Sequence, residues 1–160
     1  MSYAHYWSWE TPRTGGDKFA RWSRDVQTLL EQYPSYPNHC WEGLTPYPVP
    51  SNWSMNKICG PSGTGEPVIM KTEVAFNGDA SADHHHDTFR ISWEQLQEPN
   101  GFDGCCTSYN PYDLLVAAAL IRLIYYFPDI HISSDGGAKG LHQGAQFCRG
   151  IFGIGVNPLG

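Results

Sequence analysis

The sequence predicts an α+β domain in which a mostly antiparallel sheet packs against about three helices, one of them central and apolar. Three observations indicate this class. Alternating apolar and polar residues, typical of strands, occur at residues 3–9, 67–76 and 87–93. Residues 17–33 carry apolar side chains at helical spacing. Residues 114–127 are apolar nearly all round, which indicates a helix buried on most sides.

The first strand and the first helix follow from residue spacing. The helix is expected to begin near Asp17, whose carboxylate suits a first turn, and to end at Pro34. The strand is expected to present one aromatic face, made of Tyr3, His5, Trp7 and Trp9. The buried face of the helix is expected to contain Phe19, Trp22, Val26, Leu29, Leu30 and Tyr33.

Residues 34–66 are predicted to form a long proline-rich loop, because no apolar period continues through them. We expect this loop to be held against the domain by large apolar side chains rather than to float free. A packing cover over one sheet edge and a functional loop are both open interpretations. The expected anchors are Trp41, Tyr47, Trp53 and Ile58.

Residues 67–76 and 87–93 are predicted to pair as an antiparallel hairpin with an enlarged tip at 79–86. A short strand is expected at 102–107. On the first strand of the hairpin, the face expected to point one way consists of Val68, Met70, Thr72, Val74 and Phe76. The returning strand is expected to bury Phe89, Ile91 and Trp93.

Three residues are predicted to mark the start of the apolar helix. Asn110 is expected to cap the helix, Pro111 to occupy its first position, and Asp113 to reach back as a short capping box. A short strand at 130–132 and a last helix should follow. The buried face of that helix is expected to contain Leu141, Ala145, Cys148 and Phe152, and its glycines Gly140 and Gly144 weaken it unless they permit close packing.

Length, net charge and composition limit the classes of protein to which the chain can belong. The length of 160 residues fits one domain spanning 1–160. Sixteen acidic against ten basic residues give a net charge of −6, which argues against a nucleic-acid binder. No apolar run is long enough to span a membrane, and the first residues have no signal-peptide pattern. Five cysteines without C-x-x-C spacing favour a reducing compartment, so we expect a cytoplasmic protein.

The histidine-rich run at 83–87 suggests metal binding. On a strand, His84 and His86 point to the same face, and Asp79 can approach them across the hairpin tip. Imidazole and carboxylate are ligands of divalent transition metals, so Asp79, His84 and His86 are the candidate metal ligands. A solvated turn rich in histidine and a pH-responsive histidine are the alternatives.

Polar residues before the apolar helix suggest a second site. Cys105, Cys106, Thr107 and Ser108 precede a helix start, where free backbone amides and the helix dipole favour an anion or a thiolate. Thr107 and Ser108 are therefore candidates for ligand binding. A Cys-His-Asp arrangement with His86 and Asp87, and plain packing of two small buried cysteines, are the alternatives.

Residues 133–136, Ser-Ser-Asp-Gly, lie between the last strand and the last helix. Their hydroxyls and carboxylate can bind a ribose-like diol or can simply cap the helix. The candidate ligand-binding residues over all these segments are His86, Thr107, Ser108, Asp113, Ser134 and Asp135.

As a set, these motifs resemble a family of small uncharacterised proteins encoded by bacteriophages and bacteria. The similar stretches are residues 76–78, 86–89, 105–107, 111–113 and 133–136, and the likeness covers about 76–152. The family pattern has a Lys before the matching Thr and an Arg shortly after it. Here Cys106 and Tyr109 occupy those places, which removes the basic residues of an anion pocket. The resemblance implies a phage or prophage setting and no particular chemistry.

Together these observations favour a non-enzymatic accessory protein, encoded by a phage or prophage, that binds a small polar or nucleotide-like ligand or a host protein. One alternative is a metal-dependent hydrolase that uses Asp79, His84 and His86. A virion or assembly component, and with it a homo-oligomer, is another alternative, because many aromatic residues favour an interface.

Overall fold

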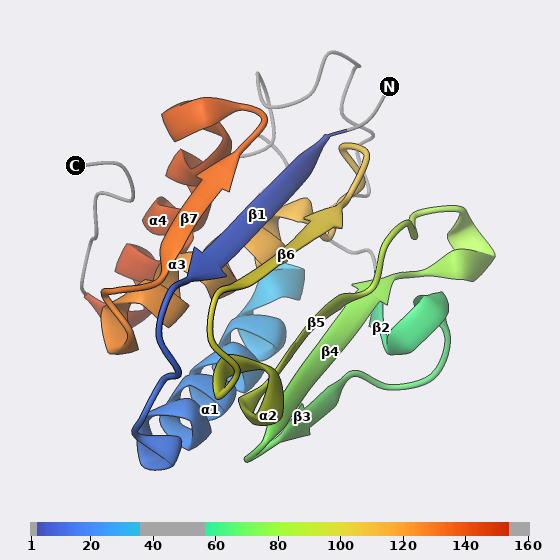
Figure 1. Ribbon diagram of the computed structural model, residues 1–160. Coiled ribbons are helices and arrows are strands. Elements are labelled where there is room, and N and C mark those ends of the chain that lie inside the picture. The colour runs from blue at the N-terminus through green and yellow to red at the C-terminus, as the bar shows by residue number, and fades with distance from the viewer. Residues whose placement is uncertain (1–2, 36–56, 154–160) are drawn as a thin grey trace.

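The computed structural model describes residues 3–35 and 57–153. These residues form an α+β fold, as the sequence predicts, with four α-helices and two antiparallel sheets (Figure 1). The expectation of one sheet is wrong, because the first strand does not pair with the predicted hairpin. Most of the predicted loop at 34–66, with the anchors Trp41, Tyr47 and Trp53, lies outside the described residues.

The first sheet has three strands in the order β6-β1-β7. β1 (Ala4–Trp9) lies in the middle and pairs antiparallel with β6 (Gly101–Cys106) and with β7 (His131–Ser134). Because both neighbours run against β1, the start of β1 and the ends of β6 and β7 lie at the same end of the sheet (Figure 1).

The second sheet is built around β4 (Glu73–Gly78), which pairs with β2 (Ile58–Cys59), β3 (Val68–Met70) and β5 (Phe89–Ser92). The predicted antiparallel hairpin is confirmed as the pairing of β4 with β5. Its tip, residues 79–88, contains a short 3-10 turn at Ala80–Ala82.

The prediction of one continuous strand over 67–76 is wrong. Met70 pairs with Glu73, so the chain reverses within two residues and forms β3 and β4 instead. The turn is held from two sides: Ser23 Oγ donates to the Met70 carbonyl at 2.7 Å, and the Trp93 amide donates to the Thr72 carbonyl at 2.8 Å. Met70 is therefore 55% exposed, whereas Val74 and Phe76 of the expected common face are fully buried.

Most of the helix predictions are close to the observed helices. The helices are α1 (Gly16–Gln32), α2 (Trp93–Leu96), α3 (Asp113–Tyr126) and α4 (Gly137–Phe152). Trp93 was expected in a strand, but Ser92 Oγ accepts the Gln95 amide at 3.1 Å and starts the short helix α2 there. Short 3-10 turns lie at Tyr33–Ser35 and Pro61–Gly63.

α3 is the central helix, as its apolar sequence predicts. Its residues from Leu114 to Leu123 are all buried, and it packs against α1, α4, β1 and β7. Gly144 of α4 permits the close approach of that helix, because a Cβ atom there would come within 2.7 Å of the Ala117 backbone. The nearly buried Arg122 donates to Asp25 at 2.7 Å and so joins α3 to α1.

The predicted start of α3 is wrong by a few residues. The helix begins at Asp113, and the Asn110 side chain donates to the Thr107 carbonyl instead of capping the helix. The residues before it form successive turns, in which Ser108 and Tyr109 have positive φ. Asp113 consequently does not reach back along its own helix, and its carboxylate turns to other partners.

Candidate functional site: a polar rim at one end of the first sheet

A cluster of polar side chains lies where β1 begins, β6 and β7 end, and α3 and α4 begin. Two helix N-termini and three strand ends meet there because of the antiparallel order β6-β1-β7 (Figure 1). We call this cluster the polar rim and define it by Tyr3, His5, Thr107, Asp113, Ser134 and Asp135.

Asp113 is the centre of one half of the rim. Its Oδ1 atom accepts hydrogen bonds from His5 Nε2 at 2.7 Å and from Thr107 Oγ1 at 2.5 Å. His5 and Thr107 are fully buried, while the Asp113 side chain keeps 15% of its surface exposed. His5 Nδ1 is buried without a hydrogen-bond partner among the described residues. The Asp113 carboxylate is therefore partly open to solvent, while His5 and Thr107, which hold it in place, are buried.

Tyr3 joins this half to the Ser-Ser-Asp-Gly segment. The Tyr3 carbonyl accepts the Thr107 amide at 2.9 Å, and its hydroxyl lies 3.5 Å from Ser134 Oγ. Glycines leave room for the hydroxyl: a Cβ atom at Gly136 or Gly140 would come within 2.5 Å of it. Burial, and next the charge of Asp113, raise the pKa of the Tyr3 phenol to about 12.

Asp135 fixes the start of β1 to the end of β7. Its Oδ2 atom accepts the Ala4 amide at 2.9 Å, and its own amide donates to the Ala4 carbonyl at 3.0 Å. Ser134 Oγ accepts the Gly136 amide at 3.1 Å, and α4 has no side-chain cap at its N-cap residue Gly136, so the capping alternative for this segment is wrong. Thr107, Asp113, Ser134 and Asp135 are thus brought together by contacts with Tyr3 and with the first two residues of β1.

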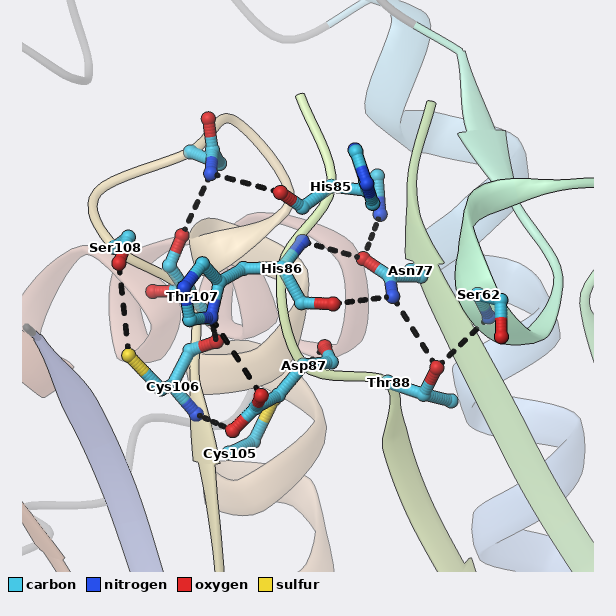
Figure 2. Close-up of polar contacts among 12 residues, drawn as sticks. Ser62, Asn77, His85, His86, Asp87, Thr88, Cys105, Cys106, Thr107 and Ser108 are labelled. Carbon is cyan, nitrogen blue, oxygen red and sulfur yellow. Dashed lines mark hydrogen bonds and ion pairs between the residues drawn. The ribbon is translucent and has the colours of Figure 1, made fainter. Parts of the chain in front are cut away.

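The hairpin tip is held by side chains that bind backbone groups (Figure 2). Asn77 is fully buried; its Oδ1 accepts the amides of Gly78 (2.7 Å) and His86 (3.1 Å), and its Nδ2 donates to the His86 carbonyl (2.9 Å). Nδ2 also lies 3.2 Å from Thr88 Oγ1, which in turn accepts the Ser62 amide. These bonds fix the path of the tip.

His86 and Asp87 attach the tip to the end of β6 (Figure 2). His86 Nδ1 lies 3.0 Å from the Cys106 carbonyl, and Asp87 Oδ2 accepts the Cys106 amide at 3.0 Å. Because a carbonyl only accepts, Nδ1 of the neutral ring carries the proton and Nε2 keeps the lone pair. Tyr112 supports the same junction by donating to the Asp87 carbonyl at 2.6 Å. His86 thus lies on the other side of β6 from Asp135.

The two neighbouring cysteines differ in their surroundings. Cys105 is fully buried, and burial, followed by the charge of Asp87, raises the pKa of its thiol far above the usual range. A buried thiol with a raised pKa is a poor nucleophile, so the geometry gives no support to a Cys-His-Asp arrangement at Cys105. Cys106 is partly exposed, and its Sγ lies 3.6 Å from Ser108 Oγ.

The candidate metal ligands Asp79, His84 and His86 have different local partners. Asp79 Oδ1 accepts the amide (3.0 Å) and the hydroxyl (2.7 Å) of Ser81, and the hydroxyl bond lowers the pKa of Asp79. The Nδ1 atoms of His84 and His85 are buried without a hydrogen-bond partner in the described part of the chain. Among residues 3–35 and 57–153, no three His, Cys, Asp or Glu side chains converge so as to hold a metal ion.

Sequence reasoning missed Tyr3, His5 and Asn77 as organising residues. His5 and Tyr3 alternate with smaller residues like any strand face, and only the pairing of β1 with β6 and β7 brings them beside Asp113 and Ser134. Asn77 had a usable signal, since an Asn-Gly pair before a wide tip often binds its own backbone.

The helices of the chain and comparisons with known proteins complete the description. In the part of the chain that the structure describes, none of the helices has the length and apolar character needed to cross a bilayer. No family model, curated protein or solved structure matches the chain.

Proposed function

We propose that this protein is a non-enzymatic accessory protein that binds a small hydroxyl-rich ligand, such as a nucleoside or nucleotide, at the polar rim. The proposal includes a phage or prophage setting, for which the sequence resemblance is the support. The observation that carries the binding proposal is a set of two groups of side-chain hydrogen bonds, His5 and Thr107 to Asp113 and Tyr3 to Ser134, which the edge-to-face contact of the Tyr3 and His5 rings joins.

The chemistry of the rim favours a ligand that donates hydrogen bonds. Asp113 and Asp135 contribute acceptor oxygens, and both stand at or just before the first turn of a helix, where the dipole stabilises a carboxylate. A ribose diol offers two adjacent donors of the kind a carboxylate binds. The ligand's sugar, rather than its phosphate, is therefore expected to face these residues.

Fixed geometry supports binding rather than catalysis at the rim. His5 is fully buried and its Nε2 is committed to Asp113, so it does not reach a ligand as a general base in this conformation. The side chains that hold one another in place lower the ordering cost of binding. No geometric observation in the described residues favours the hydrolase alternative, and a host-protein partner remains part of the proposal.

Isothermal titration of the full chain tests the proposal. The panel consists of adenosine, guanosine, cytidine, uridine and their 5′-monophosphates. At least one member should bind, and Asp135→Asn should weaken that binding by about tenfold, as expected for loss of a charge-assisted hydrogen bond.

Asp17→Asn is the matched control. Asp17 is likewise an exposed carboxylate near the start of a helix, but it belongs to α1 and is not among the residues of the polar rim. It should leave the binding unchanged. The absence of heat with every panel member, or equal weakening by Asp17→Asn and Asp135→Asn, contradicts the proposal. A thermal melt of each variant shows whether it is folded.

A further inference from the structure

The other end of the first sheet contains a pocket of about 750 Å³. It lies where β1 ends and β6 and β7 begin, roughly 20 Å along β1 from the polar rim. This volume is within the range of small-molecule sites. Its lining is formed by Ser8, Trp9, Glu10, Thr11, Arg13, Asn100, Gly101, Asp129 and His131.

One wall of this pocket is rigid. Trp9 Nε1 donates to the Glu98 carbonyl at 2.7 Å, and the Asn100 amide donates to the Glu10 carbonyl at 2.7 Å. The Trp9 ring lies directly against Gly101, where a Cβ atom would come within 1.9 Å of it, and Asn100 takes a left-handed φ of 53° in the same turn. The turn at Asn100 therefore brings the Gly101 backbone into direct contact with this indole ring.

An exposed aromatic pair stands next to the pocket on the outer face of the sheet. Phe102 is 71% exposed and stacks on Tyr6, with ring centroids 5.9 Å apart and planes at 22°. Gly104 lies opposite Tyr6 and leaves room for its ring, since a Cβ atom there would come within 2.7 Å. Ser8 pairs with both Phe102 and His131, so the aromatic pair and the pocket share one face.

The charges of the pocket argue against an anionic ligand. The Arg13 guanidinium is already paired with Asp129 at 3.3 Å and also donates to the Thr11 carbonyl at 3.0 Å. Glu10 adds a second carboxylate with no ion-pair partner among the described residues. The remaining polar groups are neutral hydroxyls, an amide and an imidazole, which together donate and accept hydrogen bonds.

We infer that this pocket and the Phe102–Tyr6 pair bind a neutral saccharide. A pyranose ring has one face of C–H groups, which packs on the electron-rich face of an aromatic ring, and a rim of hydroxyls, which needs both donors and acceptors. The site offers those two features side by side: the ring of Phe102, and the polar lining from Ser8 to His131. The inference rests on different observations from the nucleoside proposal, because the pocket lies at the other end of β1, although the Tyr6 phenol of the aromatic pair interacts with Asp135 of the rim.

The test is binding of the full chain to an array of neutral oligosaccharides, followed by titration of the best binder into isotopically labelled protein. Binding is expected, with chemical-shift changes at Ser8, Glu10 and the Trp9 indole but not at Thr107. Phe102→Ala should weaken binding by about tenfold, and Phe102→Tyr should preserve it because the aromatic face remains.

Met70→Ala is the matched control, since Met70 is also an exposed apolar side chain, 55% accessible, but lies on β3 of the other sheet. It should leave saccharide binding unchanged. No binding to any neutral oligosaccharide, binding that Phe102→Ala leaves intact, or shift changes confined to the polar rim would each overturn the inference. Phe102 is exposed, so both of its variants are expected to fold.

Discussion

The hairpin tip and the polar rim both depend on the end of β6, yet they use their polar side chains differently. At the tip, Asn77, Asp87 and His86 bind backbone amides and carbonyls. At the rim, Asp135 and Ser134 also bind backbone amides, but His5 and Thr107 bind a carboxylate on another element. Contacts between side chains are the minority of hydrogen bonds in proteins, and a satisfied network of them holds its members in one arrangement. This difference supports the proposal that the tip is structural and that a ligand binds at the rim.

Four predictions test or sharpen this comparison, and the largest effect is expected for the two adjacent cysteines of β6. Cys106 should react with iodoacetamide at least about a thousandfold faster than Cys105, because labelling of the buried thiol requires local opening. The raised pKa of Cys105 keeps it protonated up to pH 9, so raising the pH should not close the gap. Peptide mass mapping over time measures both rates, and comparable rates would contradict the described burial.

The next largest effect is expected at the tip. Asn77→Ala removes the partners of the Gly78 amide and of the amide and carbonyl of His86, which should lower the free energy of unfolding by about 3 kcal/mol. Ser81→Ala is the control at the exposed part of the tip, with a loss of about 0.5 kcal/mol. Urea denaturation measures both. A loss below 1 kcal/mol for Asn77→Ala would show that the tip is not organised by this side chain.

A smaller loss is expected at the rim. Asp113→Ala leaves His5 Nε2 and the Thr107 hydroxyl buried without their acceptor and should cost about 2 kcal/mol in the same assay. Asp17→Ala also removes a first-turn carboxylate, from α1, and should cost about 0.5 kcal/mol. Equal losses for the two variants would mean that Asp113 acts only through the helix dipole.

The smallest effect concerns pH. The pKa of Tyr3 is about 12 in the folded chain and about 10 when unfolded, so the unfolded state loses its proton first as pH rises. Stability from this group is full below pH 10 and falls between pH 10 and 12, by about 0.8 kcal/mol at pH 10.5. Tyr3→Phe should flatten the stability curve by that amount, and an unchanged slope would place the Tyr3 hydroxyl in water.

Local and distant contacts also differ in how well the sequence predicts them. Local periodicity predicted α1, the central helix α3 and the β4–β5 hairpin, because each depends on neighbours along the chain. It failed at Met70, where a two-residue turn carries no glycine, proline or asparagine to mark it.

The candidate site could likewise be predicted only in part. Thr107, Asp113, Ser134 and Asp135 could be proposed from their positions at helix starts, but their connection depends on Tyr3 and on the pairing of β1 with β7. That pairing joins segments more than a hundred residues apart and leaves no local pattern. The histidine run was predicted to bind metal from its composition alone. In the structure, the His86 ring instead contacts the Cys106 carbonyl.

We propose that a ligand binds the rim and that the tip only supports the fold. The most direct measurement is an amide chemical-shift titration of the full chain with adenosine and with guanosine, under conditions in which the protein is saturated. Shift changes are expected at Thr107, Asp113, Ser134 and Asp135, and the amides of Gly78 and Thr88 should not move. Changes centred on Gly78 and Thr88, or none with either nucleoside, would contradict it.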